Sequence, residues 1–157
     1  LAARRAGRLS LLNAAPALLE ATHLVALPDI LVVNETELAV FTGDRVPAGI
    51  DEAAALAARL PRKSAMATVV TLGADGALGF DGRGIVRIRG IDVEAVDTTG
   101  AGDIFHAGFL FALLAKRPFP AVLAFGNAAA ALSCRKMGGR AGIPSLDEIG
   151  EILARSP

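Results

Sequence analysis

The chain contains very little cysteine, no surplus of charge and no long apolar run. Its single cysteine, Cys134, cannot form an intrachain disulfide, so we expect a reducing, cytoplasmic compartment. The 16 Lys and Arg residues balance the 16 Asp and Glu residues, which leaves no positive excess to follow a nucleic-acid backbone or an anionic membrane. The two most apolar stretches, 107–115 and 121–134, are too short or too interrupted to cross a bilayer. We therefore expect no nucleic acid and no membrane as partners.

Two common nucleotide-binding motifs are also missing. The GxxxxGK[ST] sequence of P-loop nucleoside triphosphatases does not occur. Gly73, Gly76 and Gly79 do not form a GxGxxG turn, and no acidic residue follows them at the spacing of a dinucleotide-binding fold. These absences exclude the P-loop enzymes and argue against a dinucleotide-dependent oxidoreductase.

The chain does contain enough apolar material for a packed domain, because 53% of its 157 residues are hydrophobic. Short buried runs alternate with helical patterns in the first half, and helices close the second half. This order predicts an α/β fold, with a mainly parallel sheet flanked by helices and a small antiparallel hairpin. Asp51 is the expected N-cap of its helix, and Ser145 with Glu148 is expected to form a capping box. We predict strands at 9–12, 30–33, 68–72, 77–80 and 85–89, and helices at 35–41, 51–60, 104–115, 121–137 and 145–155.

A glycine-rich turn leads into a predicted helix at VDTTGAGDIFHAGF, residues 96–109. Such a turn leaves backbone amides unbonded at the positive end of the helix dipole, and the small side chains of residues 100–102 let an anion approach the backbone closely. Asp103 follows directly. A helix N-terminus alone explains the acid, because Asp caps helices, but it does not explain the small residues before it. The segment therefore indicates a phosphate site, although many helices begin in this way.

A carboxylate beside a bound phosphate costs electrostatic energy unless it does chemical work. Phosphoryl transfer provides that work, because a base accepts the proton of the acceptor hydroxyl while backbone amides hold the moving charge. Asp103 is the candidate base. His106 is a weaker candidate, since the anion hole would orient the acid rather than the imidazole three residues further on.

Several segments, in order along the chain, resemble the ribokinase-like (PfkB) carbohydrate kinases. DTTGAGD, 97–103, looks like their C-terminal signature, and VVNETELAVFTG, 32–43, looks like their Asn-Glu-x-Glu region. VTLGADGALGF, 70–80, is similar to the segment that lines their ATP site, and LLNAAPALL, 11–19, and GGRAGIP, 138–144, also fit. The resemblance implies a ribokinase-like fold, ATP and Mg²⁺ as cofactors, and a small-molecule sugar or sugar acid as the acceptor.

The resemblance also implies roles for individual residues. Asp103 would be the base for the sugar hydroxyl. Asn34 would help hold the nucleotide phosphates, and Glu37 would act on Mg²⁺ through water; the same two residues are spaced as an N-cap and its capping-box partner, and both roles are compatible. A buried Asn such as Asn127 is also often a satisfied core amide. The anion hole would be formed by Gly100, Ala101 and Gly102, and further nucleotide contacts by Thr71, Gly73, Gly76 and Asn127.

A monovalent cation, K⁺, is a further cofactor that the resemblance implies. Asp97 and Thr99 match the loop that holds such an ion next to the anion hole in many relatives. Its other ligands would be backbone carbonyls, which residue identity cannot test. These carbonyls would lie around Ser133, Lys136, Gly138 and Gly142.

Members of the family are much longer than this chain, and their N-terminal half carries most of the sugar contacts. Nothing in this sequence matches that half, and the sequence begins with Leu1. We therefore expect residues 1–157 to be the C-terminal, nucleotide-binding half of a kinase domain, without the substrate and lid half. The alternatives to a sugar kinase are a non-catalytic ATP-binding fragment and a nucleoside kinase of the same family. The GGRAGIP ending favours a sugar, and a homodimer is left open.

Overall fold

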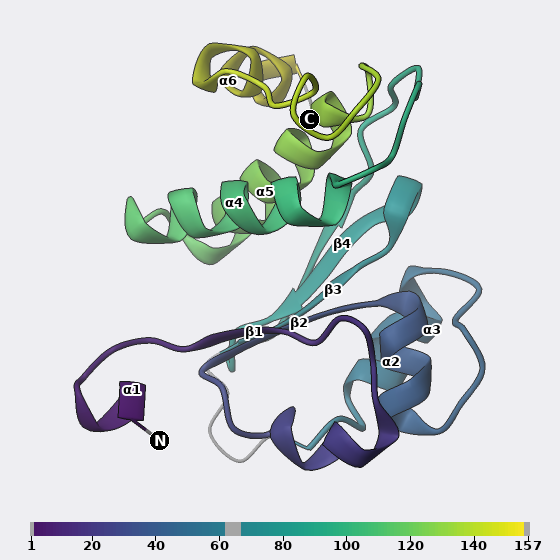
Figure 1. Cartoon of the computed structure of the whole chain (residues 1–157), viewed down its shortest axis with the longest axis vertical. Helices are drawn as coiled ribbons and strands as arrows, with labels where there is room; N and C mark the ends of the chain where they lie inside the picture. Colours follow the sequence, from purple (N-terminus) through teal and green to yellow (C-terminus); the bar gives the residue numbers. More distant parts are fainter. Residues whose placement is uncertain (1, 62–66, 156–157) are drawn as a thin grey trace. The chain divides into compact units, whose positions relative to one another are not determined.

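The computed structural model describes residues 2–61 and 67–155, and the chain divides into two compact units. The first unit comprises Leu1–Gly73 and Ala77–Arg87, and the second comprises Ala74–Gly76 and Ile88–Pro157. The elements drawn in Figure 1 follow one another in this order: α1 Ala2–Arg5, β1 Leu11–Asn13, the short 3₁₀-helix η1 Leu19–Leu24, β2 Ile30–Asn34, α2 Glu35–Thr42, α3 Ile50–Ala57, β3 Ala67–Thr71, the 3₁₀-turn η2 Gly73–Asp75, β4 Gly76–Phe80, β5 Ile85–Arg89, α4 Ala101–Leu114, α5 Phe119–Ser133 and α6 Leu146–Arg155.

The five strands form one mixed sheet in the order β1-β2-β3-β4-β5. β1 pairs with β2 and β2 with β3 in parallel, whereas β3 pairs with β4 in antiparallel orientation. Parallel neighbours require crossover connections, which α2 and α3 supply between β2 and β3. The α/β fold with a mainly parallel sheet is confirmed. Four residues, 81–84, connect the neighbouring strands β4 and β5, as a hairpin requires, and Gly82 supplies the left-handed turn residue with φ of 83°.

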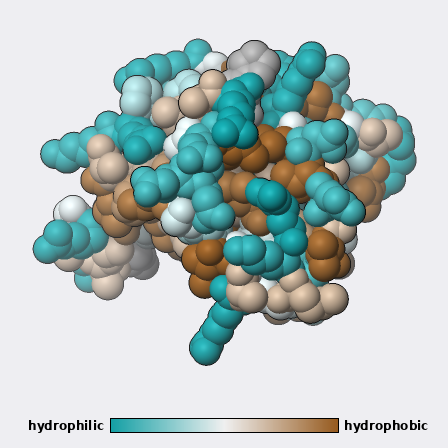
Figure 2. Space-filling model, turned by 90° about the horizontal axis from the view of Figure 1, so that it is seen from above, coloured by the Kyte–Doolittle hydropathy of each residue, from teal (hydrophilic) through white to brown (hydrophobic). Residues whose placement is uncertain are grey.

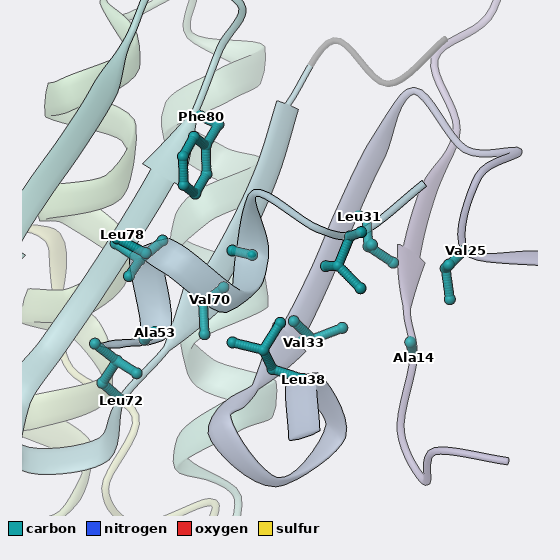
Figure 3. Packing of buried hydrophobic residues seen from close by; sticks show 13 residues of the cluster. Ala14, Val25, Leu31, Val33, Leu38, Ala53, Val70, Leu72, Leu78 and Phe80 are labelled. Atoms are coloured by element: carbon teal, nitrogen blue, oxygen red, sulfur yellow. The ribbon is translucent and has the colours of Figure 1, made fainter. Parts of the chain in front are cut away.

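The core of the first unit lies between the central strands and the two helices that pack on them. β2 and β3 are rich in β-branched residues, which suit a strand covered on its faces, and four of the five residues in each strand are buried. α2 packs against β2 and β3, and α3 packs against α2 and β3. Figure 3 shows the side chains that meet there, among them Ala14, Val25, Leu31, Val33, Leu38, Ala53, Val70, Leu72, Leu78 and Phe80.

The second unit is built from α4, α5 and α6. α4 packs along α5, which also contacts α6 (Figure 1). The approach of α4 to α5 is close because Gly108 has no side chain: a Cβ atom there would lie 2.9 Å from the Cβ of Ala129. The stacked rings of Phe105 and Phe109, with centroids 6.1 Å apart, are both buried on α4.

Several helix boundaries differ from those that the sequence predicts. α4 begins at Ala101 rather than near 104, because Gly100 adopts the left-handed conformation and serves as the N-cap. α5 ends at Ser133 rather than near 137, because the carbonyl of Cys134 accepts hydrogen bonds from the distant amides of Val96 and Asp97. The N-cap of α3 is Gly49, so the prediction that Asp51 caps this helix is wrong.

Asp51 is not the N-cap because α3 begins one residue before it, at Ile50. Asp51 lies in the first turn of α3, where its carboxylate is 3.2 Å from the guanidinium of Arg87. The capping box predicted for Ser145 and Glu148 is confirmed, with both reciprocal bonds present at the start of α6. Cys134 is half-buried, and its thiol donates to the carbonyl of Ala130 at 3.3 Å.

Some large apolar side chains remain on the surface, and in the view of Figure 2 they appear between hydrophilic residues. Leu114 at the end of α4 is 79% exposed, and Leu19 in η1 is 69% exposed. No helix within residues 2–61 and 67–155 has both the length and the apolar character needed to cross a membrane.

Candidate phosphoryl-transfer site

The signature segment forms a tight turn that runs directly into α4. Gly100 has φ of 78°, a conformation that a side chain would strain, and the amide of Ala101 donates to the carbonyl of Thr98 at 3.1 Å. The next amide engaged in the helix is that of Ile104, which donates to the carbonyl of Gly100 at 2.9 Å. The amides of Gly102 and Asp103 have no acceptor among the residues that the structure describes. Two free donors therefore lie at the positive end of the α4 dipole.

Asp103 lies in the first turn of α4 and its side chain is exposed. No cap hydrogen bond is made at this helix end, so Asp103 does not act as the N-cap that its position suggests. Within the described part of the chain, its carboxylate has neither a hydrogen-bond partner nor an ion pair. The acid is thus available to accept a proton from a bound molecule, next to two amides that suit an anion.

His106 lies one turn further along α4. Its Nδ1 donates to the carbonyl of Gly102, which fixes the ring against the first turn. Its Nε2 is buried and has no partner among the described residues, and the ring meets Phe105 edge-on at 6.0 Å between centroids. The side chain of His106 is half-buried.

Asp97 joins the turn before α4 to the loop after α5. Its Oδ1 accepts the amide of Thr99 at 2.9 Å, and its Oδ2 accepts the amide of Gly138 at 2.8 Å. The hydrogen bonds from Thr99 and then from Gly138 lower the pKa of the Asp97 carboxyl below its ordinary value. Asp97 and Thr99, the two side chains predicted for a cation site, therefore lie together, and the carboxylate already binds two amides.

Asn34 and Glu37 form the predicted capping box at the start of α2. Asn34 Oδ1 accepts the amide of Glu37, and Glu37 Oε2 accepts the amide of Asn34, each at 2.8 Å. Asn34 is also the register partner of Thr71 at the carboxyl ends of the parallel strands β2 and β3. Ligands of open parallel sheets bind beyond these ends. The structure thus brings together three of the predicted nucleotide and magnesium residues of the first unit.

The other predicted nucleotide residues have local structural roles that need no ligand. Gly73 opens the turn η2 with φ of 54°. Gly76 has φ of 100°, and a Cβ atom there would collide with the backbone of Ile88. The close approach of this backbone is enough to explain why the residue at position 76 is glycine. Asn127 is buried on α5 and donates to the carbonyl of Arg89 at 2.9 Å. Its amide nitrogen is therefore a satisfied core group, as the sequence allows.

The sequence gives no signal for the backbone groups that support this turn. The carbonyl of Cys134 accepts the amides of Val96 and Asp97 at 2.7 and 3.1 Å, and the backbone of Gly139 lies against that of Thr99. Every residue carries a backbone carbonyl, and every residue except proline carries an amide N–H, so no pattern of side chains could have identified these groups.

The chain matches known proteins over most of its length. It matches the model of the pfkB family carbohydrate kinases over residues 1–146. The ribokinase of Haemophilus influenzae is 40% identical over 153 residues, which cover 96% of this chain and 49% of the relative. The chain thus spans about half the length of this relative.

Solved structures show the same fold. Arabidopsis thaliana ribokinase complexed with ribose and ATP is 29% identical, with a TM-score of 0.83, and the match covers 97% of this chain and 49% of that one. A fructokinase variant from Vibrio cholerae, in its fructose-, ADP- and potassium-bound form, is 28% identical, with a TM-score of 0.70, over 83% of this chain and 42% of that one. On the family match, the signature at 97–103 and the fold, the chain belongs to the pfkB family of carbohydrate kinases.

Proposed function

We propose that the protein transfers the γ-phosphoryl group of ATP to a hydroxyl of a small sugar or sugar acid. One observation carries the proposal: the exposed, unpartnered carboxylate of Asp103 lies beside the free amides at the start of α4. The amides suit the charge that develops on the transferred group, and the carboxylate suits the proton that leaves the acceptor hydroxyl. The hydroxyl oxygen attacks the γ-phosphorus. The bond between the γ-phosphorus and the oxygen that bridges the β- and γ-phosphates then breaks, so that ADP leaves, and the hydroxyl proton passes to Asp103.

The anion hole in this proposal consists of Gly100, Ala101 and Gly102. The amide of Ala101 donates to Thr98 in the structure, so the amides of Gly102 and Asp103 would make the direct contacts with the phosphoryl oxygens. The small side chains at 100–102 then matter because they leave the backbone open to a bulky anion.

The nucleotide and its metal would use residues at the carboxyl ends of β2 and β3. Asn34 and Thr71 are register partners there, which supports a common role toward the phosphates. Glu37 fits Mg²⁺ as an outer ligand, because a carboxylate is a hard oxygen donor and one of its oxygens is committed to the amide of Asn34. The ion would neutralise charge on the phosphates. Gly73, Gly76 and Asn127 remain predictions as nucleotide contacts.

A monovalent cation beside Asp97 and Thr99 is part of the proposal. The lowered pKa of Asp97 keeps the carboxylate charged, which supports the assignment, and the fructokinase variant from Vibrio cholerae is a potassium-bound structure. Turnover should be faster in K⁺ than in choline at equal ionic strength. Equal turnover in the two buffers would remove the cation from the mechanism.

The test is phosphate transfer from ATP by the intact protein to a panel of pentoses, hexoses, sugar acids and nucleosides. We expect one sugar or sugar acid to be phosphorylated well above the ATP hydrolysis seen without acceptor. Preference for a nucleoside would move the protein to the other acceptor class of the same reaction. Absence of transfer to every acceptor, together with a melting midpoint that rises on adding Mg·ATP, would support the non-catalytic ATP-binding alternative.

A further inference from the structure

The segment before α4 is held by the far end of α5 rather than by any strand. The amides of Val96 and Asp97 both donate to the carbonyl of Cys134, at 2.7 and 3.1 Å. Cys134 is the C-cap of α5, where carbonyls have no partner within the helix. The segment therefore uses an acceptor that the end of α5 leaves available.

The carboxylate of Asp97 adds two bonds to this junction. Oδ1 accepts the amide of Thr99, which closes the turn locally, and Oδ2 accepts the amide of Gly138, 41 residues away. Bonds from amides to an ionised carboxylate are stronger than bonds between neutral groups. Asp97 therefore fixes both the shape of its own turn and the position of that turn against the loop after α5.

The two loops also meet backbone to backbone. A Cβ atom on Gly139 would lie 3.2 Å from the carbonyl oxygen of Thr99, and one on Gly100 would lie 3.5 Å from the Cα of Gly139. At the far end of the same loop, a Cβ atom on Gly142 would collide with the carbonyl of Ser133. The loop 138–142 is thus held between the turn before α4 and the end of α5, and small shifts in it would be passed to Gly100.

We propose that Asp97 is a positioning residue, which acts through the amides of Gly138 and Thr99 to hold the turn 97–100 and thereby aim the free amides at the start of α4. This inference rests on the proposed function, because it concerns the same anion hole. It differs from a cation-ligand role in one respect: the carboxylate orders the turn through protein amides, whether or not an ion is bound.

The test compares Asp97→Asn with wild type in the intact protein. The Asn amide group cannot accept from the amide of Gly138, while its oxygen keeps the bond from Thr99. A matched control is Asp81→Asn, because Asp81 Oδ1 accepts the amide of Arg83 at 3.0 Å in the same local pattern, and Asp81 has no distant partner among the described residues. The readouts are amide hydrogen exchange of residues 96–102, in K⁺ and in choline, and steady-state kinetics with the acceptor that the panel identifies.

We expect Asp97→Asn to speed amide hydrogen exchange of residues 96–102 by about tenfold or more in both buffers. This factor corresponds to the free energy of one lost hydrogen bond to a charged group. kcat should fall by a similar factor, while KM for Mg·ATP stays within about twofold. Asp81→Asn should change neither. A second variant, Gly142→Ala, displaces the loop 138–142 without touching the carboxylate and should also speed exchange of residues 96–102.

Two results would overturn the proposal. The first is unchanged exchange of residues 96–102 in both variants. The second is faster exchange in wild-type protein on removal of K⁺ that Asp97→Asn does not increase further, since Asp97 would then act only as a cation ligand. If wild-type protein transfers no phosphate to any acceptor, the proposed function fails, but the exchange experiment still decides whether Asp97 holds the turn.

Discussion

The side chains of Asn34 and Glu37 exchange hydrogen bonds with each other's backbone amides, each at 2.8 Å. Glu37 is 6% exposed, although it is a carboxylate. The pair therefore caps α2 and at the same time presents Asn34 at the carboxyl end of β2, opposite Thr71 of β3. One local motif thus serves helix stability and the proposed phosphate contact.

Replacing Asn34 by Ala should separate these two roles. We expect Asn34→Ala to destabilise the protein by about 1 kcal/mol, the usual cost of a lost N-cap, and to weaken binding of Mg·ATP by about tenfold or more. The control is Ser145→Ala, which removes the side-chain half of the equivalent box on α6. Ser145→Ala should lower the free energy of unfolding by a similar amount and leave ATP binding unchanged. Urea unfolding and calorimetric titration measure the two effects, and equal ATP binding in both variants would contradict the role of Asn34.

Asp103→Asn should remove the proposed base without changing the shape of the site. We expect kcat to fall by about 10²- to 10⁴-fold, with KM for ATP nearly unchanged, as for one acid–base residue. Asp147→Asn is the matched control, because Asp147 is an exposed acid in the first turn of α6. Steady-state kinetics of both variants provide the measurement. A wild-type rate in Asp103→Asn would exclude Asp103 from the mechanism.

The stability of α6 should depend on pH through Glu148. Hydrogen bonds from Ser145 lower the pKa of Glu148 from its ordinary value of 4.5, with smaller contributions from Lys136 and Arg135. The unfolded state therefore binds this proton more readily, so the stabilisation is fully present above pH 4.5 and is lost as pH falls through the lower pKa of the folded state.

The melting temperature of Glu148→Gln should lie below that of the wild-type protein at pH 7. This difference in melting temperature should disappear in strong acid, where Glu148 is itself neutral. Glu151→Gln is the control, since Glu151 has only an exposed contact of 3.7 Å with Arg155. Melting curves at pH 7 and pH 3 make the comparison. A difference between Glu148→Gln and wild type that persisted unchanged in acid would contradict the assignment.

The packing of α4 on α5 should not tolerate a branched side chain at Gly108. Its Cβ would lie 2.9 Å from the Cβ of Ala129 and 3.3 Å from the Cα of Gly126. We expect Gly108→Val to cost about 1–3 kcal/mol of stability through overpacking. Gly150→Ala on α6 is the control: its Cβ meets nothing within 4 Å, so helix propensity should raise stability by up to about 1 kcal/mol. Chemical denaturation of both variants tests the contrast, and a neutral Gly108→Val would show that the helices separate easily.

The sequence alone determined the features whose partners are close along the chain. The alternation of apolar runs predicts the α/β fold, and the spacing of Asn34 with Glu37 and of Ser145 with Glu148 predicts two capping boxes that the structure contains. The glycine-rich turn before Asp103 is likewise a local pattern. The two capping boxes depend on bonds between residues three positions apart, so neighbouring side chains suffice to define them.

Only the tertiary structure decided the contacts between distant segments. Asn34 faces Thr71 because of strand register, Asp97 binds Gly138 across 41 residues, and Asn127 binds Arg89 across 38. The same applies to the ion pair of Asp51 with Arg87, 36 residues further along the chain. Strand register follows from packing, and the acceptors and donors at 89 and 138 are backbone groups that every residue type carries. The residue types at 97–103 indicate phosphate chemistry, and long-range packing sets the positions of the groups that would perform it.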